Sequence, residues 1–289
     1  MELTNYNEIT ALLTRHGFRF SKSMGQNFLT ARWVPEEIAE GAEIDENSGV
    51  LEVGPGIGCL TAELSKRAGK VVSVELDKSL KPVLKETLEG RDNVEVIFSD
   101  VLKLDIAELC REKFQGLRPS VCANLPYNVT TPLITAFIEA DCFDSITVMI
   151  QREVARRICA EPNTSDYGAF GIFVNYYMEP QLLFDVPPSC FIPQPKVTSS
   201  VIHLKKRSCP PVEVKDEKLL FKVIRAAFNQ RRKTLCNALG SAFGNLNKDV
   251  IGKIIENAGF DTRIRGEVLD IVGFAKISDE IYNIISTDL

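Results

Sequence analysis

Residues 50–58 read VLEVGPGIG, an apolar run that passes directly into a loop with glycine at alternate positions. The apolar run predicts a buried strand at 50–53, and the apolar spacing of residues 60–68 predicts a helix after the loop. Alternate glycines permit a tight turn and let a ligand lie against bare backbone. A loop that serves only as a turn is the alternative. Either way, the stretch has the strand-loop-helix order of an α/β fold.

Predicted strands and helices continue to alternate as far as residue 150. A helix is predicted through Leu80 and Leu84, and further strands are predicted at 71–74, 94–98, 121–124 and 146–150. Alternating strands and helices indicate a Rossmann-like, mostly parallel sheet with right-handed crossovers. Residues 182–186 and 197–204 predict two more strands joined by a proline-rich loop. We expect this pair to form an antiparallel hairpin at the sheet edge.

After Cys209-Pro210-Pro211, a credible linker, the periodicity is purely helical. Helices are predicted at 219–228, 233–243, 250–258 and 277–285. The first 30 residues end in a polar segment with neither period, which predicts an arm before the core. The sequence therefore predicts a domain at 1–208 with an N-terminal arm (1–30), and a small all-helical domain at 209–289.

The composition is that of an ordinary globular protein, with 45% hydrophobic and 25% charged residues. A net charge of −5 excludes a uniformly basic coat for nucleic acid but allows a local basic face. Eight cysteines without a C-x-x-C pair, and only two histidines, predict buried structural thiols and no metal site. Because no apolar run approaches 18 residues and no signal pattern begins the chain, we expect a cytoplasmic protein, outside membranes. With no apolar seam left over, we expect a monomer.

The residue before the glycine loop selects among its possible ligands. A dinucleotide fingerprint counted from Gly54 and Gly56 would place its third glycine at Cys59, so it is incomplete. The carboxylate of Glu52 would repel a pyrophosphate but attract the ammonium group of a methionine moiety. The pattern therefore favours S-adenosylmethionine as the cofactor.

Two further carboxylates end the next two predicted strands. Glu75 is placed to accept hydrogen bonds from both ribose hydroxyls of the cofactor; a solvent-facing strand end is the alternative. Asp100 is placed to accept from the exocyclic amine of the cofactor's adenine, with a helix cap as the alternative. The order of glycine loop, acid and acid at the ends of three successive strands supports the cofactor roles.

The fourth predicted strand runs into Asn124-Leu125-Pro126-Tyr127. The side-chain oxygen of Asn124 and the carbonyl of Leu125 could accept hydrogen bonds from adenine N6, whose lone pair is otherwise delocalised into the ring. Pro126 fixes the turn, and Tyr127 can stack on an extruded base. Positioning and electrostatics then suffice for methyl transfer without a general base. An ordinary Asn-Pro loop with a buried tyrosine is the alternative.

Seven motifs in this chain resemble, in order, those of the KsgA (RsmA) family of ribosomal RNA adenine dimethyltransferases. They are residues 25–29 (GQNFL), 52–58 (EVGPGIG), 74–77 (VELD), 124–127 (NLPY), 186–188 (VPP), 191–197 (FIPQPKV) and 228–234 (FNQRRKT). Each motif is moderately specific, and the ordered set is very specific. The resemblance implies a class I methyltransferase fold.

The resemblance also implies residue roles and a substrate. Asn27 and Leu29 of the arm would close over the cofactor, whose pocket would be completed by Gly54, Glu75, Asp100 and Asn124. Phe191 would stack on the target adenine opposite Tyr127. The substrate would be two adjacent adenosines in the 3′-terminal hairpin loop of 16S ribosomal RNA, dimethylated at N6 in the immature small ribosomal subunit. Ala123 stands where many members of the family have glycine, a small-for-small change.

A basic segment at 205–233 predicts the RNA contact. It carries ten Lys or Arg against three Asp or Glu, a local net charge of +7. Arginines that open a helix can bind phosphates with two hydrogen bonds each; a solvated helix face is the alternative. The predicted RNA-contacting residues are Arg231, Arg232, Lys233, Lys196 and Arg152.

Three rival functions remain at this point. The large-subunit RNA methyltransferases that confer macrolide resistance share the chemistry, and methylation of immature small or large subunits separates the two. A non-catalytic assembly factor would keep the fold as an RNA clamp, which a catalytically dead Glu75→Ala variant would reveal by rescuing assembly. A nicotinamide oxidoreductase would be stabilised by NAD and not by S-adenosylmethionine.

Overall fold

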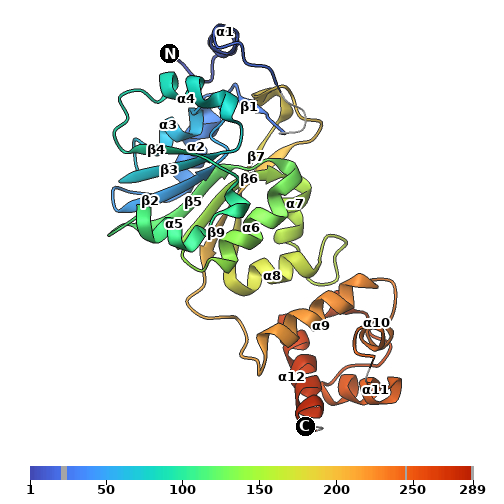
Figure 1. Cartoon of the computed structure of the whole chain (residues 1–289). Coiled ribbons are helices and arrows are strands. Elements are labelled where there is room, and N and C mark those ends of the chain that lie inside the picture. Colours follow the sequence, from blue (N-terminus) through green and yellow to red (C-terminus); the bar gives the residue numbers. More distant parts are fainter. Residues whose placement is uncertain (21–24, 245, 288–289) are drawn as a thin grey trace. The chain divides into compact units, whose positions relative to one another are not determined.

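The computed structural model describes residues 1–20, 25–244 and 246–287, and within them the main sheet has seven strands (Figure 1). The strand order is β4-β3-β2-β5-β6-β9-β7. The strands from β4 to β6 in this order are parallel neighbours, and β9 is antiparallel to β6. Their bounds are β2 (Ser48–Val53), β3 (Lys70–Glu75), β4 (Val94–Phe98), β5 (Arg118–Asn124), β6 (Ser145–Gln151), β7 (Met178–Val186) and β9 (Ser199–Lys206). The predicted mostly parallel sheet with a late antiparallel pair at its edge is confirmed.

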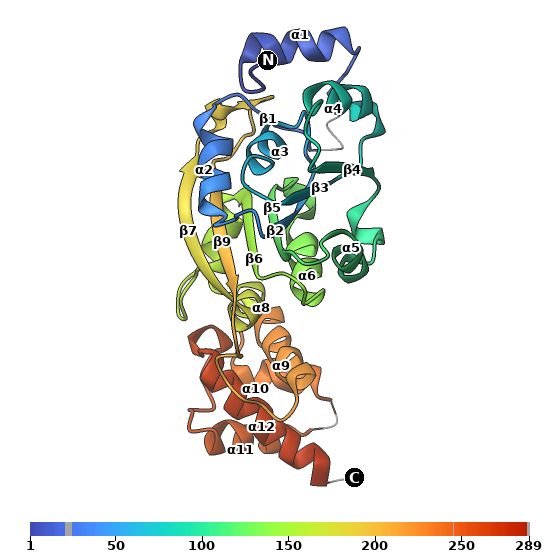
Figure 2. The ribbon, with the colours of Figure 1, turned by 90° about the vertical axis from the view of Figure 1, so that its left-hand side faces the viewer.

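Helices cover both faces of this sheet (Figure 2). Successive residues of a strand point to opposite faces, and Val50 and Leu51 of β2 are both fully buried. One face packs against Ile38 of α2 and Leu64 of α3. The helices of this part are α1 (Tyr6–Arg15), α2 (Trp33–Gly41), α3 (Cys59–Leu64), α4 (Lys81–Thr87), α5 (Ile106–Lys113) and α6 (Thr130–Glu139). The helix predicted at 60–68 ends early, at Leu64.

The N-terminal 30 residues contain a helix, α1, that the arm interpretation did not include. Its apolar residues Ile9, Leu12 and Leu13 share one helix face and are buried in a cluster with Leu80 and Leu84. Residues 21–24, which belong to the predicted polar segment, lie outside the described residues. Further along the arm, a two-residue strand, β1 (Phe28–Leu29), pairs antiparallel with β8 (Phe191–Ile192).

The chain forms two compact units. The first contains residues 1–155 and 179–206, and the second contains residues 156–178 and 207–289. The helices of the second unit are α8 (Ala169–Tyr177), α9 (Glu217–Asn229), α10 (Leu235–Ala242), α11 (Lys248–Asn257) and α12 (Ile271–Thr287), while α7 (Arg152–Ile158) begins in the first unit. All four predicted C-terminal helices are present. The second unit also includes residues 156–178, which the predicted helical domain at 209–289 does not.

All eight cysteines are free thiols, and five of them are buried. Among the described residues, no helix is both long and apolar enough to cross a membrane. The described part of the chain also contains no cluster of three or more His, Cys, Asp or Glu side chains suited to a metal ion.

Candidate functional site

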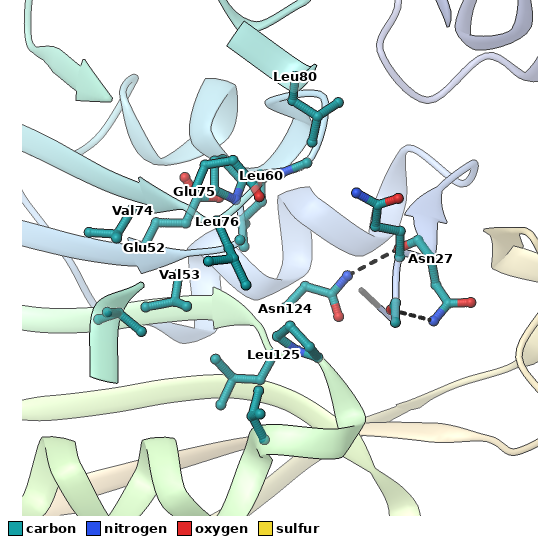
Figure 3. A pocket seen from close by; sticks show the side chains of 18 of the residues that line it. Asn27, Glu52, Val53, Leu60, Val74, Glu75, Leu76, Leu80, Asn124 and Leu125 are labelled. Atoms are coloured by element: carbon teal, nitrogen blue, oxygen red, sulfur yellow. Dashed lines mark hydrogen bonds between the residues drawn. The ribbon is translucent and has the colours of Figure 1, made fainter. Parts of the chain in front are cut away.

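A cavity of about 240 Å³ lies in the first unit, at the carboxyl ends of β2, β3, β4 and β5. Strands β2, β3 and β4 follow one another outward, whereas β5 returns to the other side of β2. Such a reversal leaves a crevice where ligands of open parallel sheets bind. The lining includes the glycine loop, Glu75, Asp100, Asn124 and residues 25–29 of the arm. Figure 3 shows Glu75, Asn124 and Asn27 around one space.

The glycine loop presents bare backbone to this cavity. Gly54 and Gly56 have φ angles of +70° and +59°, in the left-handed region that favours glycine. A Cβ at Gly54 would approach only Cδ of Pro126, at 4.0 Å, so the space beside this residue is open. A Cβ at Gly56 would lie 3.0 Å from the ring of Phe28, because the arm packs directly on the loop.

Glu52 is buried beneath the loop, with 1% of its surface exposed. Its Oε2 accepts hydrogen bonds from the hydroxyls of Thr61 and Ser73, both at 2.6 Å. Burial raises the pKa of Glu52 to about 7, although the two hydrogen bonds oppose the shift. A cation bound beside this carboxyl would favour its charged form, so its charge state couples to the ligand.

Glu75 does not face solvent, which rules out the alternative for this residue. It is 6% exposed and lines the cavity, and its carboxylate accepts from the backbone N–H groups of Asp77 (2.8 Å) and Gly56 (3.3 Å). Burial raises the pKa of Glu75. Hydrogen bonds fix the orientation of this carboxylate at the point where strand β3 enters the cavity.

Asp100 caps a short helix and also lines the cavity. Its Oδ1 accepts from the backbone N–H of Leu102 at 3.2 Å and so caps the short 3-10 helix Val101–Lys103. The same residue lines the cavity beside Val101. The cap directs the carboxylate, and the remaining oxygen contacts Lys103 Nζ at 3.6 Å.

The arm reaches the end of β5. The side-chain nitrogen of Asn124 donates to the carbonyl of Asn27 at 3.4 Å, and the side chain of Asn27 donates to the carbonyl of Gly25 at 3.1 Å (Figure 3). Because its nitrogen is engaged, Asn124 offers its oxygen as the acceptor. Leu29 is 1% exposed and also lines the cavity. The arm residues implied by resemblance therefore lie at this cavity.

The turn after Asn124 is held by main-chain and side-chain contacts. The N–H of Leu125 donates to the carbonyl of Met149 on β6 at 3.1 Å, and the Thr130 hydroxyl donates to the carbonyl of Pro126 at 3.2 Å. Tyr127 is half-buried and lines the cavity. Residues 124–127 therefore form a turn at the edge of the cavity, and these hydrogen bonds fix its main chain.

Phe191 is in a different position from the one that the resemblance implies. Its surface is 3% exposed, it lies outside the cavity lining, and it packs with Leu29, Val34 and Ile38 in the core. Its backbone pairs with Leu29 in the β1–β8 ladder. The ring is therefore not available to a base in this conformation, and a stacking role would require β8 to move.

The predicted RNA-contacting residues are divided by the structure. The Arg231 guanidinium is used internally: it donates to Glu267 (2.7 Å) and to the carbonyls of Ser165 (2.7 Å) and Thr164 (2.8 Å). This contradicts its expected role as a phosphate ligand. The three basic residues also precede α10 rather than open it, since Thr234 is its N-cap.

The other four predicted residues remain exposed. Arg232, Lys233 and Lys196 are on the surface. Arg152 is 44% exposed and lies 3.7 Å from a carboxylate oxygen of Asp185. These side chains keep the solvent access that phosphate contact requires.

The residues of the cavity fit S-adenosylmethionine by the chemistry of their donor set. Glu52 and Glu75 are buried carboxyls that line the cavity, and a carboxylate can pair with a cation or accept hydrogen bonds from hydroxyls. Bare backbone at Gly54 leaves room for a ligand, and the apolar side chains of Leu76 and Val101 line the remaining wall. Reasoning from the sequence missed Thr61 and Ser73, the two hydroxyl donors to Glu52. A hydroxyl in an otherwise apolar helix or strand was the only feature of the sequence that could have indicated them.

A family model described as ribosomal RNA adenine dimethylase matches residues 17–276. A relative from Alkaliphilus metalliredigens, named ribosomal RNA small subunit methyltransferase A, is 46% identical over 97% of this chain and 98% of its own length. A relative of the same name from Clostridioides difficile is 45% identical, over 99% and 97%.

Solved structures agree with the fold. A dimethyladenosine transferase from Plasmodium falciparum superposes with a TM-score of 0.73 at 24% identity, covering 90% of this chain and 98% of that one. The 23S rRNA methyltransferase ErmE superposes with a TM-score of 0.66 at 25% identity, covering 88% and 99%. With a model match over most of its length and full-length relatives near 46% identity, the chain belongs to the ribosomal RNA adenine dimethylase family, enzymes whose methyl donor is S-adenosylmethionine.

Proposed function

We propose that this chain dimethylates N6 of two adjacent adenosines in the 3′-terminal hairpin loop of 16S ribosomal RNA, acting in the cytoplasm on the immature small subunit. The observation that carries the proposal is the juxtaposition of Asn124 with the glycine loop and two buried carboxyls in one cavity. The full-length relatives named for the small subunit are 45–46% identical, whereas the large-subunit enzyme is 25% identical. This difference favours the small subunit.

The residues of the turn act on the base. When bound, S-adenosylmethionine supplies an electrophilic methyl group on its sulfonium. The oxygen of Asn124 and the carbonyl of Leu125 accept hydrogen bonds from N6, which localises the nitrogen lone pair for attack. The cofactor would supply the methyl group that N6 accepts, and N6 would then lose a proton to water. Tyr127 stacks on the extruded base and fixes its plane.

The residues of the strand ends hold the cofactor. Glu52 would compensate the charge of the methionine ammonium group, Glu75 would accept from the ribose hydroxyls, and Asp100 would accept from the adenine amine. Asn27 and Leu29 close the arm over the site. Gly54 and Gly56 bring bare backbone against the methionine part.

Asn124→Ala tests the chemical step. Removing the acceptor should lower methyl transfer by about 100-fold or more, the scale for a lost preorganised hydrogen-bonding group at a reacting atom. The dissociation constant for S-adenosylmethionine, measured by calorimetry, should rise only a few-fold. Asn128→Ala is the matched control, because Asn128 is exposed, lies four residues further on and is outside the cavity lining. Unchanged turnover in Asn124→Ala would refute the assigned role.

We propose that α9 and the turn after it form the RNA-docking face of the second unit. Lys218, Lys222 and Arg225 are exposed and recur at intervals of four and three residues, so they lie along one side of α9. Among the described residues, none of these three forms an ion pair, and neither do Arg232 and Lys233. In a chain with a net charge of −5, such a cationic stripe complements the phosphates of a duplex.

Salt dependence tests this docking face. Arg232→Ala removes one expected phosphate contact and leaves the cationic residues of α9 intact. Its binding to small subunits from a strain lacking the methylation should weaken, with a salt slope smaller by about 1. Immature large subunits provide the specificity control, and we expect no methylation of them. An unchanged slope would exclude Arg232 from the interface. Sedimentation equilibrium tests the expectation, drawn from the sequence, that the chain is a monomer.

A further inference from the structure

The hydroxyl of Tyr127 is held by a residue far away in the sequence. Its Oη lies 2.6 Å from Oγ of Ser199, the first residue of β9, which is fully buried. Ser199 is itself fixed, because it pairs with Gln151 in the antiparallel β6–β9 ladder. The sheet therefore holds the distal end of the Tyr127 ring, and the turn holds its backbone.

We propose that Ser199 is a positioning residue: its buried hydroxyl holds the Tyr127 ring at the place where it stacks on the target adenine. The inference rests on the proposed function, which assigns the stacking to Tyr127.

The backbone of the turn does not set the ring by itself. The contacts of Leu125 with Met149 and of Thr130 with Pro126 fix the main chain, yet they leave the side-chain torsions of Tyr127 free. One bond at the far end of the ring fixes the rotation about Cα–Cβ, and with it the place of the ring, because Oη moves with this rotation and lies on the axis of the other. Stacking on an aromatic ring contributes strongly to the binding of an unpaired base, and a loss of about 1 Å in alignment costs up to 100-fold in rate.

The neighbouring residue provides a matched control. Ser200 is also fully buried on β9, but its hydroxyl donates to Asp185 on the edge strand at 2.5 Å. Ser199→Ala and Ser200→Ala each remove one buried hydroxyl from the same strand. A purely structural role predicts similar effects of the two changes, whereas a positioning role predicts that only Ser199→Ala affects the base.

The test uses the full-length enzyme and an RNA hairpin with 2-aminopurine at the target position, whose fluorescence is quenched by stacking. We expect Ser199→Ala to lose at least half of the quenching. On the matching hairpin with adenine at the target position it should lose about 10-fold in kcat, with the KM for S-adenosylmethionine within twofold of the unmodified enzyme. Tyr127→Phe, which keeps the ring and lacks the hydroxyl, should behave alike. The double variant should be no worse than either single one, because both remove the same contact. Ser200→Ala should match the unmodified enzyme.

The outcomes separate two failures. If Tyr127→Ala keeps the quenching, the stacking role in the proposed function is wrong. If Tyr127→Ala loses it while Ser199→Ala and Tyr127→Phe keep it, the positioning role alone is wrong. Losses that multiply in the double variant would also overturn the proposal. Should Ser199→Ala fail to fold, Tyr127→Phe decides the question, since it alters only the half-buried partner.

Discussion

Replacing Arg231 by alanine should destabilise the second unit, although its position in a basic run suggests an RNA contact. The guanidinium bridges three segments that are distant in the sequence, through Glu267 and the carbonyls of Thr164 and Ser165. Its neighbour Arg232 is exposed and has no ion pair among the described residues. The two adjacent arginines therefore make a matched pair with opposite expected effects.

The magnitude follows from the three hydrogen bonds. Each bond to a charged donor contributes about 1.5–3 kcal/mol when buried. The Arg231 side chain is 36% exposed and that of Glu267 is 24% exposed, so we take about 1 kcal/mol for each bond. Arg231→Ala should then lower the free energy of unfolding by about 2–3 kcal/mol. Arg231→Lys should lose about half of this, because an ammonium group cannot span the three acceptors.

Urea unfolding of the full-length chain, followed by far-UV circular dichroism, measures the change. With a slope of about 1–3 kcal/mol per molar urea, the midpoint of the transition that reports the second unit should fall by about 1 M or more. Arg232→Ala should change the free energy of unfolding by less than about 0.5 kcal/mol. If the two variants unfold alike, while Arg231→Ala weakens RNA binding, then Arg231 contacts phosphate and the internal bridge contributes little.

Two further predictions concern the cofactor half of the site. Because burial raises the pKa of Glu52 to about 7, a bound ammonium group should lower it, and S-adenosylmethionine binding at pH 7 should release about half a proton. Calorimetry in buffers of different ionisation enthalpy measures this proton release. The release should vanish in Glu52→Gln. A release that persists in this variant would come from another group. Gly56→Ala should weaken S-adenosylmethionine binding because its Cβ meets the Phe28 ring at 3.0 Å, whereas Gly90→Ala, with φ of +76° and nothing within 4 Å, carries only the backbone strain. Equal binding by both variants would show that the contact between arm and loop is unimportant.

The cofactor half of the site could be predicted because of how parallel strands are arranged. Glu52, Glu75, Asp100 and Asn124 lie at or just after the carboxyl ends of four strands whose apolar runs are plain in the sequence. Parallel strands bring these ends to one edge of the sheet, so residues that are far apart in the sequence must converge. All four side chains line one cavity. The apolar runs that predict the strands are therefore enough to predict that these four residues lie close together.

The charge states and partners of individual side chains could not be predicted in this way. A carboxylate before a glycine loop looks ionised, and only packing shows that Glu52 is buried between Thr61 and Ser73. An Arg-Arg-Lys run looks uniformly solvated, and only the tertiary fold brings Glu267 to Arg231. Both outcomes depend on contacts between residues from 9 to 36 positions apart, which local patterns do not encode.

The segment from Phe191 to Ser199 explains how the two halves of the site are joined. At its start, Phe191 pairs with Leu29, and the preceding carbonyl of Cys190 accepts from Thr30, so this end holds the arm over the cofactor space. At its other end, Ser199 holds the ring of Tyr127. The buried ring of Phe191 stabilises this pairing, because a ring packed in the core keeps β8 in register with β1 of the arm. One short segment thus holds both the arm and the Tyr127 ring, to which the proposed function assigns closure over the cofactor and stacking on the base.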